Sequence, residues 1–527
     1  MNRLLTLVFL VGTISLSLTA QTVETIPNET SLTYAVKYGS VNVMESNNFI
    51  ADPTKTKLAR QDNKRNRNFE KRFPQNILRP ELEHQGPDKL RQKDFPLTKN
   101  RPLQVFLNVD GLDNGNAPQD PSGDVGESLY LQAVNATLIA AYDKVTGEEV
   151  GRFTGNTLWQ PLGTISGGDP IILYDQELSK WVITEFPGTF GANGNRLLVA
   201  VSQTEDPLGS YDVYAFNTPS FPDYPKYAVW NNAYVVTTNE GGRGVLDAYF
   251  INRDEITSGA QNVRILATQV NGTNGSEQGF IVSTPVDWSG ETPPNSDTPP
   301  CTVSLADASW SFNQNEDEVV VDEYVIDWVD ETISTQRTRI EVAPYDSNPC
   351  RSNGVGFSCI PQPGANGLDG LPEIITFQPH YRNFGTHESM VFNFITDVTD
   401  GDDLSGIRWI ELRKTTGNPW SLFQEGTFAP SDDLHRFMCG IALDGSGNIG
   451  MAYSVSSEDT PAGLAVTGRL STDPLGIMTL GEIPIVDGEG GLATFGRFSD
   501  YSHITTCLLY TSPSPRDATL SRMPSSA

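Results

Sequence analysis

The stretch GIALDGSGNIGMAY, residues 440–453, contains two short apolar runs separated by a polar, glycine-rich turn. Gly440–Leu443 and Ile449–Tyr453 have the length and apolar content of β-strands. Asp444–Asn448 supplies the Asp, Gly and Asn residues that adopt the positive φ angles of tight turns. The stretch therefore predicts a β-hairpin.

The same pattern recurs through most of the chain. Apolar runs alternate with short polar turns at residues 129–142, 170–184 and 227–237, and long helical periods are nearly absent. Repeated hairpins at intervals of roughly 40–60 residues predict an all-β fold, a β-propeller of about six or seven four-stranded blades. Tandem β-sandwiches are the alternative.

The N-terminal part differs from this repeated body. Residues 1–20 carry Arg3 and a long apolar run, which is the pattern of a signal peptide. Residues 21–103 are basic and interrupted by prolines, and only Leu32–Val43 has the pattern of a strand. We therefore expect a largely irregular segment ahead of a propeller at residues 104–506.

The last 21 residues, 507–527, end in a Ser/Pro-rich run without strand alternation. Their composition indicates a non-native read-through tail. We therefore expect the native C-terminus to be missing, together with any sorting domain that follows it.

The charge of the chain excludes several classes of partner. Residues 1–103 hold 16 of the 36 Lys and Arg but only 10 of the 65 Asp and Glu, so the net charge of −29 lies entirely in the body. An acidic body repels nucleic acid and anionic lipid. After residue 20 no apolar run is long enough for a membrane helix, so no membrane insertion is expected. The predicted location is outside the cytoplasm, secreted or at the cell surface. The oligomeric state is left open.

Export permits disulfide bonds. Cys301, Cys350 and Cys359 fall in one irregular region, and any pair of them is a disulfide candidate. Cys439 lies in an apolar run and is expected to be a small buried residue.

Arginines and carboxylates on separate strand segments raise the question of glycan chemistry. A propeller mouth that collects such groups could bind or cleave an acidic sugar. Either the arginines converge at the axis, or each pairs with a local carboxylate between blades. The candidate binding residues are Arg382, His387, Glu388, Arg408, Arg436, Asp500 and Tyr501.

No catalytic residue can be assigned from the sequence. It contains no nucleophile elbow, phosphate-binding loop or dinucleotide fingerprint. His387-Glu388 lacks the second histidine of a metalloprotease motif.

Calcium is the most plausible cofactor, because oxygen-rich loops supply the ligands that hard cations prefer. The candidate ligands are Asp120 and Asp124 in one loop, and Asp444 and Asn448 in another. A plain turn is the alternative in each case, because neither loop has the full twelve-residue calcium pattern.

Several of these stretches together resemble an uncharacterised family of secreted Bacteroidetes-type β-propeller proteins. The resemblance extends from about Val105 to Thr506, and the stretches are Asp120–Gly126, Gly168–Asp175, Asp223–Tyr227, Tyr381–Glu388, Gly406–Arg413 and Asn448–Ser457. It implies a propeller that is often exported by the type IX route, with no assigned activity. Arg497–Ser502 resembles the start of the family's last blade, which implies that this blade is truncated here.

The leading functional hypothesis is a secreted or cell-surface binding module for a glycan or an extracellular protein. One alternative is a sialidase-like glycan-processing enzyme, a glycoside hydrolase or lyase, on the same scaffold. Another is a structural protein without an axial ligand. A fold by itself does not decide function. The residues at the propeller axis discriminate among these hypotheses, because convergent arginines there favour the enzyme and an apolar plug there favours the structural role.

Overall fold

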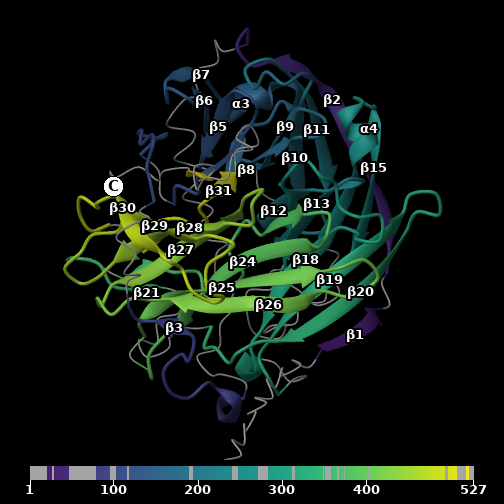
Figure 1. Cartoon of the computed structure of the whole chain (residues 1–527). Coiled ribbons are helices and arrows are strands. Elements are labelled where there is room, and N and C mark those ends of the chain that lie inside the picture. The colour runs from purple at the N-terminus through teal and green to yellow at the C-terminus, as the bar shows by residue number, and fades with distance from the viewer. Residues whose placement is uncertain are drawn as a thin grey trace, which may run out of the picture.

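The structure is a computed structural model that describes residues 21–26, 29–46, 79–94, 103–115, 118–188, 194–239, 247–270, 283–310, 315–347, 349, 358–364, 367–372, 374–401, 403–492, 496–506 and 518–520. Strands dominate these residues (Figure 1). The helices are single turns, such as α3 (Gly155–Leu158) and α4 (Arg253–Thr257). No described helix is long and apolar enough to cross a membrane.

Six groups of four antiparallel strands follow one another along the chain. Blades 1 to 3 comprise β4 (Ser122–Val125), β5 (Leu129–Val134), β6 (Leu138–Asp143) and β7 (Glu149–Thr154); β8 (Ser166–Asp175), β9 (Lys180–Pro187), β10 (Arg196–Ser202) and β11 (Ser210–Asn217); and β12 (Asp223–Val229), β13 (Ala233–Asn239), β14 (Ala248–Asn252) and β15 (Asn262–Thr268).

Blades 4 to 6 comprise β16 (Thr284–Pro285), β18 (Cys301–Ala306), β19 (Glu318–Asp327) and β20 (Thr332–Glu341); β23 (His380–Asn383), β24 (Glu388–Asp397), β25 (Ser405–Lys414) and β26 (Ser421–Phe428); and β27 (His435–Leu443), β28 (Ile449–Ser456), β29 (Gly463–Arg469) and β30 (Leu480–Val486). β17 (Asp287–Trp288) pairs in parallel with β23, and β21 (Ser358–Ile360) pairs with β22 (Leu368–Asp369) between blades 4 and 5.

The innermost strands close a ring. Contacts run in turn from β4 to β8, β12, β16 and β17, β23 and β27, then to β31 (Ile504–Thr506) and back to β4. β31 thus occupies a seventh position, where β32 (Ala518–Leu520) pairs with it over three residues. The predicted β-propeller is confirmed: the described residues form six four-stranded blades with β31 at a seventh position, and they contain no tandem sandwiches.

The hairpin quoted first shows how the local sequence specifies a blade. β27 and β28 pair antiparallel across the turn Asp444–Asn448. Asp444 Oδ1 accepts hydrogen bonds from the backbone N–H groups of Ser446 and Asn448, at 2.8 and 2.9 Å, and Gly447 has a φ of 79°. A side-chain acceptor and a glycine in the left-handed region together fix the reversal.

The N-terminal segment adds strands to the outer edges of several blades. β2 (Ser31–Asn42) lies between β11 and β15 and joins blades 2 and 3 into one nine-stranded sheet. β1 (Gln21–Ile26) pairs with β20, and β3 (Arg91–Gln92) pairs with β26. β2 is the strand expected at Leu32–Val43, whereas β1 and β3 were not predicted.

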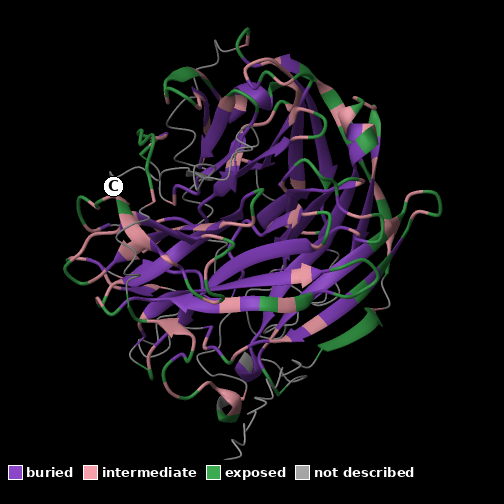
Figure 2. Ribbon diagram, viewed as in Figure 1, coloured by how far each residue is buried: buried purple, intermediate pink, exposed green. Residues whose placement is uncertain are grey.

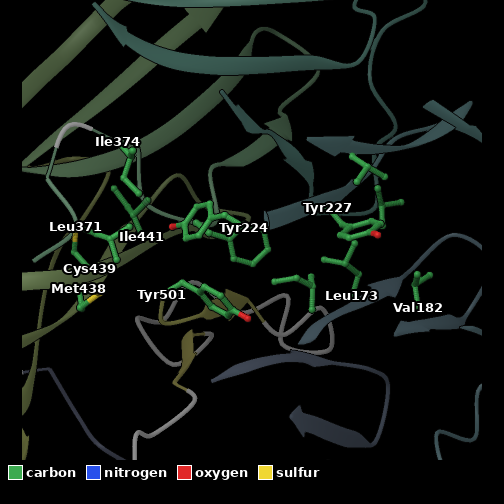
Figure 3. Packing of buried hydrophobic residues seen from close by; sticks show 14 of the residues in the cluster. Leu173, Val182, Tyr224, Tyr227, Leu371, Ile374, Met438, Cys439, Ile441 and Tyr501 are labelled. Atoms are coloured by element: carbon green, nitrogen blue, oxygen red, sulfur yellow. The ribbon is translucent and has the colours of Figure 1, made fainter. Parts of the chain in front are cut away.

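The core lies between neighbouring blades, so most strands are buried on both faces (Figure 2). All ten residues of β24 are buried, for example. The largest cluster of buried apolar side chains contains Tyr224 and Tyr501 with Leu371, Met438 and Ile441 (Figure 3).

Candidate functional site

Three of the innermost strands share an unusual backbone feature near their start. Asp120, Asp169 and Tyr224 have φ angles of 44°, 53° and 54°, and each directly precedes a proline. Left-handed backbone is strained for residues with side chains, and such strain gathers at sites that the surrounding structure holds firmly. The feature therefore marks the region where blades 1, 2 and 3 meet.

A buried lysine lies at the centre of this region. Lys226 of β12 is fully buried, and its Nζ lies 3.4 Å from the ring centroid of Tyr224 and 4.1 Å from that of Tyr501. A desolvated ammonium between two aromatic faces is held by strong cation–π attraction. Nζ also donates a hydrogen bond to the carbonyl of Pro225, at 3.2 Å.

Hydrogen bonds tie this lysine–tyrosine pair to neighbouring blades. Asp120 accepts from the backbone N–H of Asp500 and from Asn135 Nδ2, both at 2.7 Å. Tyr224 OH donates to the carbonyl of Asp500, at 3.2 Å, and Tyr501 OH donates to that of Pro170, at 3.1 Å. Burial, and then the charges of Asp120 and other nearby aspartates, raise the pKa of Tyr224 well above its usual value.

We refer to Asp120, Asp169, Tyr224, Lys226 and Tyr501 as the axial cluster. All five are less than 5 % exposed, and the tyrosines lie among the apolar side chains drawn in Figure 3. The cluster can therefore hold the inner strands together, but its described residues leave no path for a substrate to reach them. The cluster is buried but polar, so it does not match the apolar plug that the structural alternative anticipates.

The predicted arginines each have their own partners. Arg408 forms ion pairs with Asp88, at 2.9 Å, and with Glu425, at 3.2 Å. Arg436 pairs with Asp432, at 2.7 Å, and with Glu482, at 2.8 Å.

Arg382 contacts two other elements: its Nε donates to the carbonyl of Leu443 in β27, at 3.1 Å, and its Nη2 to Thr506 Oγ1 in β31, at 3.2 Å. The ion pairs of Arg408 and Arg436 correspond to the local-pairing alternative. The contacts of Arg382 connect blade 5 with β27 of blade 6 and with β31.

Glu388 and His387 lie at the start of β24. Glu388 is fully buried and accepts from Thr298 Oγ1, at 2.8 Å, and from the backbone N–H of Asn295, at 3.2 Å. It therefore anchors the loop that precedes β18. His387 stacks on Phe384, with the ring centroids 5.1 Å apart.

Of the predicted site residues, the structure brings together Asp120, Asp500 and Tyr501. Asp500 also pairs with Arg497, whose Nε lies 2.9 Å from Asp500 Oδ1. The other candidates take part in the separate contacts described above.

The oxygen-rich loops are used by the protein itself. Asp124 accepts from the backbone N–H of Tyr174, at 2.7 Å, and from Thr505 Oγ1, at 2.6 Å, and burial raises its pKa to about 6. Asp444 and Asn448 form the hairpin turn described above. Within the described ranges no group of three or more His, Cys, Asp or Glu could hold a metal ion. Calcium binding stays a prediction.

The cysteines differ in state. Cys301 is a free, buried thiol, so its proposed role in a disulfide was wrong. β18 places it in the core between paired strands. Cys359 is disulfide-bonded, and Cys350 lies outside the described residues. Cys439 is free and buried as expected, and burial raises its pKa to about 12.

Four apolar side chains of β2 are exposed to solvent. Leu32, Tyr34, Val36 and Tyr38 alternate along the strand and are 36 %, 46 %, 38 % and 47 % exposed. Because side chains alternate in a strand, all four lie on the same face. We refer to them as the β2 stripe.

Sequence reasoning missed Lys226, Asp169 and Tyr224. A signal was present in the sequence, because Asp120, Asp169 and Tyr224 each directly precede a proline. All three lie close to the start of the first strand of successive blades. The β2 stripe was also readable as alternating apolar residues. Which face of that strand is exposed depends on β11 and β15, which lie far along the chain.

No protein-family model matches this chain, and no curated protein matches it in sequence. Among solved structures, the β-propeller domain of Cps50 (Swd1) from Myceliophteria thermophila is 8 % identical with a TM-score of 0.35, over 74 % of this chain and 91 % of that one. The exo-β-1,3-galactanase of Phanerochaete chrysosporium is 11 % identical with a TM-score of 0.27, over 64 % of this chain and 77 % of that one. A PL25 ulvan lyase is 11 % identical with a TM-score of 0.27, over 71 % of this chain and 96 % of that one. Identities and TM-scores this low assign neither an activity nor a ligand.

Proposed function

We propose that this protein is a secreted or cell-surface β-propeller that acts as a binding module for another extracellular protein. The observation that carries the proposal is the β2 stripe, in which Tyr34 and Tyr38 alternate with two aliphatic residues and all four are exposed. Contiguous exposed apolar side chains are typical of interaction sites, and tyrosine is enriched at protein interfaces.

The location of the stripe supports a role in binding. β2 pairs with β15 through Ser31–Val36 and with β11 through Val36–Asn42, so it is held to one blade or the other along its length. Its exposed side chains therefore offer a partner a contact surface on an ordered strand. Because the strand is already ordered, little conformational entropy is lost when it binds.

The composition of the stripe favours a protein over a glycan. Sugars are held by aromatic rings together with several polar groups, whereas Leu32 and Val36 offer only aliphatic surface. The enzyme alternative gains no support from the described residues, because the axial cluster is buried and the arginines have local partners.

Export is proposed on two grounds. Residues 1–20 have the pattern of a signal peptide, and Cys359 is disulfide-bonded, which is typical of proteins outside the cytoplasm. The type IX route remains a proposal that rests on the family resemblance.

The test compares the unaltered protein with a Tyr34→Ser/Tyr38→Ser double variant. Both are immobilised and exposed to extracellular proteins from the source culture, and both are applied to a glycan array. The control is Val145→Ser/Val329→Ser, which removes apolar side chains that are 70 % and 91 % exposed elsewhere on the molecule.

We expect a protein that the unaltered chain and the control retain, and that the tyrosine variant binds at least about tenfold more weakly. Retention that is equal in all three would contradict the proposal. Array binding that depends on the tyrosines would instead assign a glycan ligand.

A further inference from the structure

Residues 79–94 of the N-terminal segment lie against the outer edge of blade 5 and have little regular structure of their own. They contain the single turn η1 (Pro80–Leu82) and the two-residue strand β3. β3 pairs in parallel with β26, outside the four strands of the blade (Figure 1). We refer to residues 79–94 as the strap.

The ends of the strap contact the two neighbouring blades. The backbone N–H of Arg79 donates to the carbonyl of Ser309, between β18 and β19 of blade 4, at 3.0 Å. At the other end the side-chain amide of Gln92 bonds to the backbone of Met478, which precedes β30 of blade 6. Its Nε2 donates to the carbonyl and its Oε1 accepts from the N–H, both at 2.9 Å. The strap therefore extends across three blades.

One buried carboxylate anchors the middle of the strap. Asp88 is 4 % exposed, and its Oδ2 lies 2.9 Å from Arg408 Nη2 and accepts from Thr427 Oγ1, at 2.7 Å. Its Oδ1 accepts from the backbone N–H of Leu90, at 2.7 Å, and so shapes the turn that leads into β3. Charge-assisted hydrogen bonds of this kind are strong and depend closely on geometry.

The blades hold the socket for this carboxylate by their own contacts. Arg408 is fully buried, its Nε donates to Thr427 Oγ1, at 2.6 Å, and its Nη1 donates to the carbonyl of Ala343, at 3.1 Å. The same Nη1 lies 3.2 Å from Glu425 Oε2. These contacts orient the guanidinium group whose Nη2 binds Asp88. A cation that is oriented in advance loses little entropy when it binds a carboxylate.

Beside the anchor, the strap is held through main-chain groups of the blade. The backbone N–H of Thr427 donates to the carbonyl of Leu90, at 3.2 Å, and Arg91 Nε donates to the carbonyl of Ala429, at 2.9 Å. Main-chain hydrogen bonds along the edge of a sheet, together with a side-chain pocket, are the way in which peptides are recognised by strand addition. The contacts of the strap are of this type.

We propose that the outer edge of blade 5 is a recognition groove for peptide segments with the pattern Asp-x-x-Arg-Gln. The strap, with Asp88, Arg91 and Gln92 in this pattern, is its exchangeable occupant. Each of the six blades has four strands without the strap, so its departure leaves the blades complete. A partner protein that presents the same pattern competes with the strap for the groove.

The groove is separate from the β2 stripe, which lies on the strand between blades 2 and 3. Binding at the groove therefore does not depend on the function proposed above. Variants of Tyr34 and Tyr38 should leave peptide binding unchanged, so failure at one site is distinguishable from failure at the other.

The test uses the full chain with Asp88→Ala, which keeps the strap but removes its anchor. A fluorescent synthetic peptide with the sequence of residues 79–94 is added to the unaltered chain and to the variant, and its anisotropy is measured. Two further peptides carry Asp88→Asn and Lys89→Ala. The first keeps an acceptor for the turn but has no charge, and the second is the matched control because Lys89 is exposed.

We expect the parent peptide to bind the Asp88→Ala protein at least about tenfold more tightly than the unaltered chain, in which the tethered strap competes at high effective concentration. The Asp88→Asn peptide should bind at least about tenfold more weakly than the parent peptide, because it offers Arg408 no charge. The Lys89→Ala peptide should bind as the parent does. Absence of binding to the variant, or equal binding of the Asp88→Asn peptide, overturns the proposal.

A second measurement needs no variant protein and covers the case in which Asp88→Ala does not fold. Backbone hydrogen exchange of the unaltered chain is followed at the bonded amides of Arg79 and Gly86 in the strap and in β25. The competitor is an excess of the Lys89→Ala peptide, whose mass differs from that of the strap.

Displacement should speed exchange at the two strap amides at least about threefold and leave β25 unchanged, whereas a peptide that also carries Asp88→Asn should have no effect. Strap amides that exchange only together with β25, whichever peptide is present, overturn the proposal, because the strap is then an integral part of the blade.

Discussion

Lys226 places a charged group where water does not reach, and burial of a charge is costly unless neighbouring groups compensate it. The ammonium lies against the rings of Tyr224 and Tyr501, which attract its charge. Lys226→Met keeps the length of the side chain but removes this cation–π attraction. We expect a loss of about 2 kcal/mol in the free energy of unfolding, measured with urea.

Lys144→Met is the control for this substitution, since Lys144 is only partly buried and donates to the carbonyl of Gly126. It should change the free energy of unfolding by no more than about 0.5 kcal/mol. A Lys226→Met protein as stable as the parent would show that the axial cluster does not depend on its charge.

His503 gives a prediction about pH. It accepts a hydrogen bond from the backbone N–H of Gly123 at Nδ1 and its Nε2 lies 2.7 Å from Gln378 Oε1, so the folded protein holds it neutral. Burial lowers its pKa to about 3. A histidine whose folded pKa is lowered contributes stability above its unfolded value near 6.5, and this is lost as the pH falls toward the folded value.

Between pH 7 and pH 4.5 the His503 contribution should therefore fall by about 2–3 kcal/mol. His503→Gln should show a correspondingly smaller loss over the same interval in urea titrations. Equal pH dependence in the two proteins would contradict the assignment.

Residue identity alone could nominate Arg408 and Arg436 but not their role. Their partners Asp88 and Glu482 lie 320 and 46 positions away. Such pairing depends on how β30 and the N-terminal segment are placed in the folded molecule, which no local pattern encodes. Lys226 was missed for the same reason, because one lysine in an apolar strand is unremarkable until Tyr501 is brought against it.

At the scale of elements, displacement of β2 should destabilise two blades at once, because this strand pairs with β11 of blade 2 and β15 of blade 3. Ala35 lies on its inner face and is fully buried. Ala35→Asp buries a carboxylate in an apolar environment and should lower the free energy of unfolding by about 3 kcal/mol or more. Tyr38→Asp, on the exposed face, should cost about 0.5 kcal/mol or less.

Urea unfolding of the two β2 variants decides this point. Equal stability would mean that β2 does not remain docked between β11 and β15 in solution. The comparison also separates a loss of stability from a loss of binding, because Tyr38 belongs to the β2 stripe and Ala35 does not.

Elements with strong internal periodicity were predictable, and short edge strands were not. The hairpin at 440–453 and β2 carry their own alternation. β1 and β3 acquire strand structure only from partners, as in the pairing of Gln21 with Ile340. β3 has just two residues, too few for any alternation to be read.

At the scale of the whole molecule, repeated hairpins were enough to predict a propeller of six or seven blades. They could not show where the ring closes, because closure joins β31 to β4 across almost the entire body. In the described part of the chain, β31 is the element that occupies the seventh position of this ring.

Deletion of residues 507–527 is a test at this scale. β32 contributes only three residue pairs, to a strand that β4 and β27 already contact. We expect the thermal midpoint to change by less than about 2 °C, measured by differential scanning fluorimetry. A fall of more than about 5 °C would show that the tail is an integral part of the fold.

The shared sheet of blades 2 and 3 has a mechanical consequence. Because β2 hydrogen-bonds to both β11 and β15, these two blades cannot pivot independently, and together they form one stiff plate. The hollow of about 280 Å³ between blades 6 and 1, by contrast, lies on the other side of blade 1. Under tension the molecule should therefore behave as a split ring, in which strain concentrates at the gap between blades 6 and 1 while the plate moves as a rigid unit.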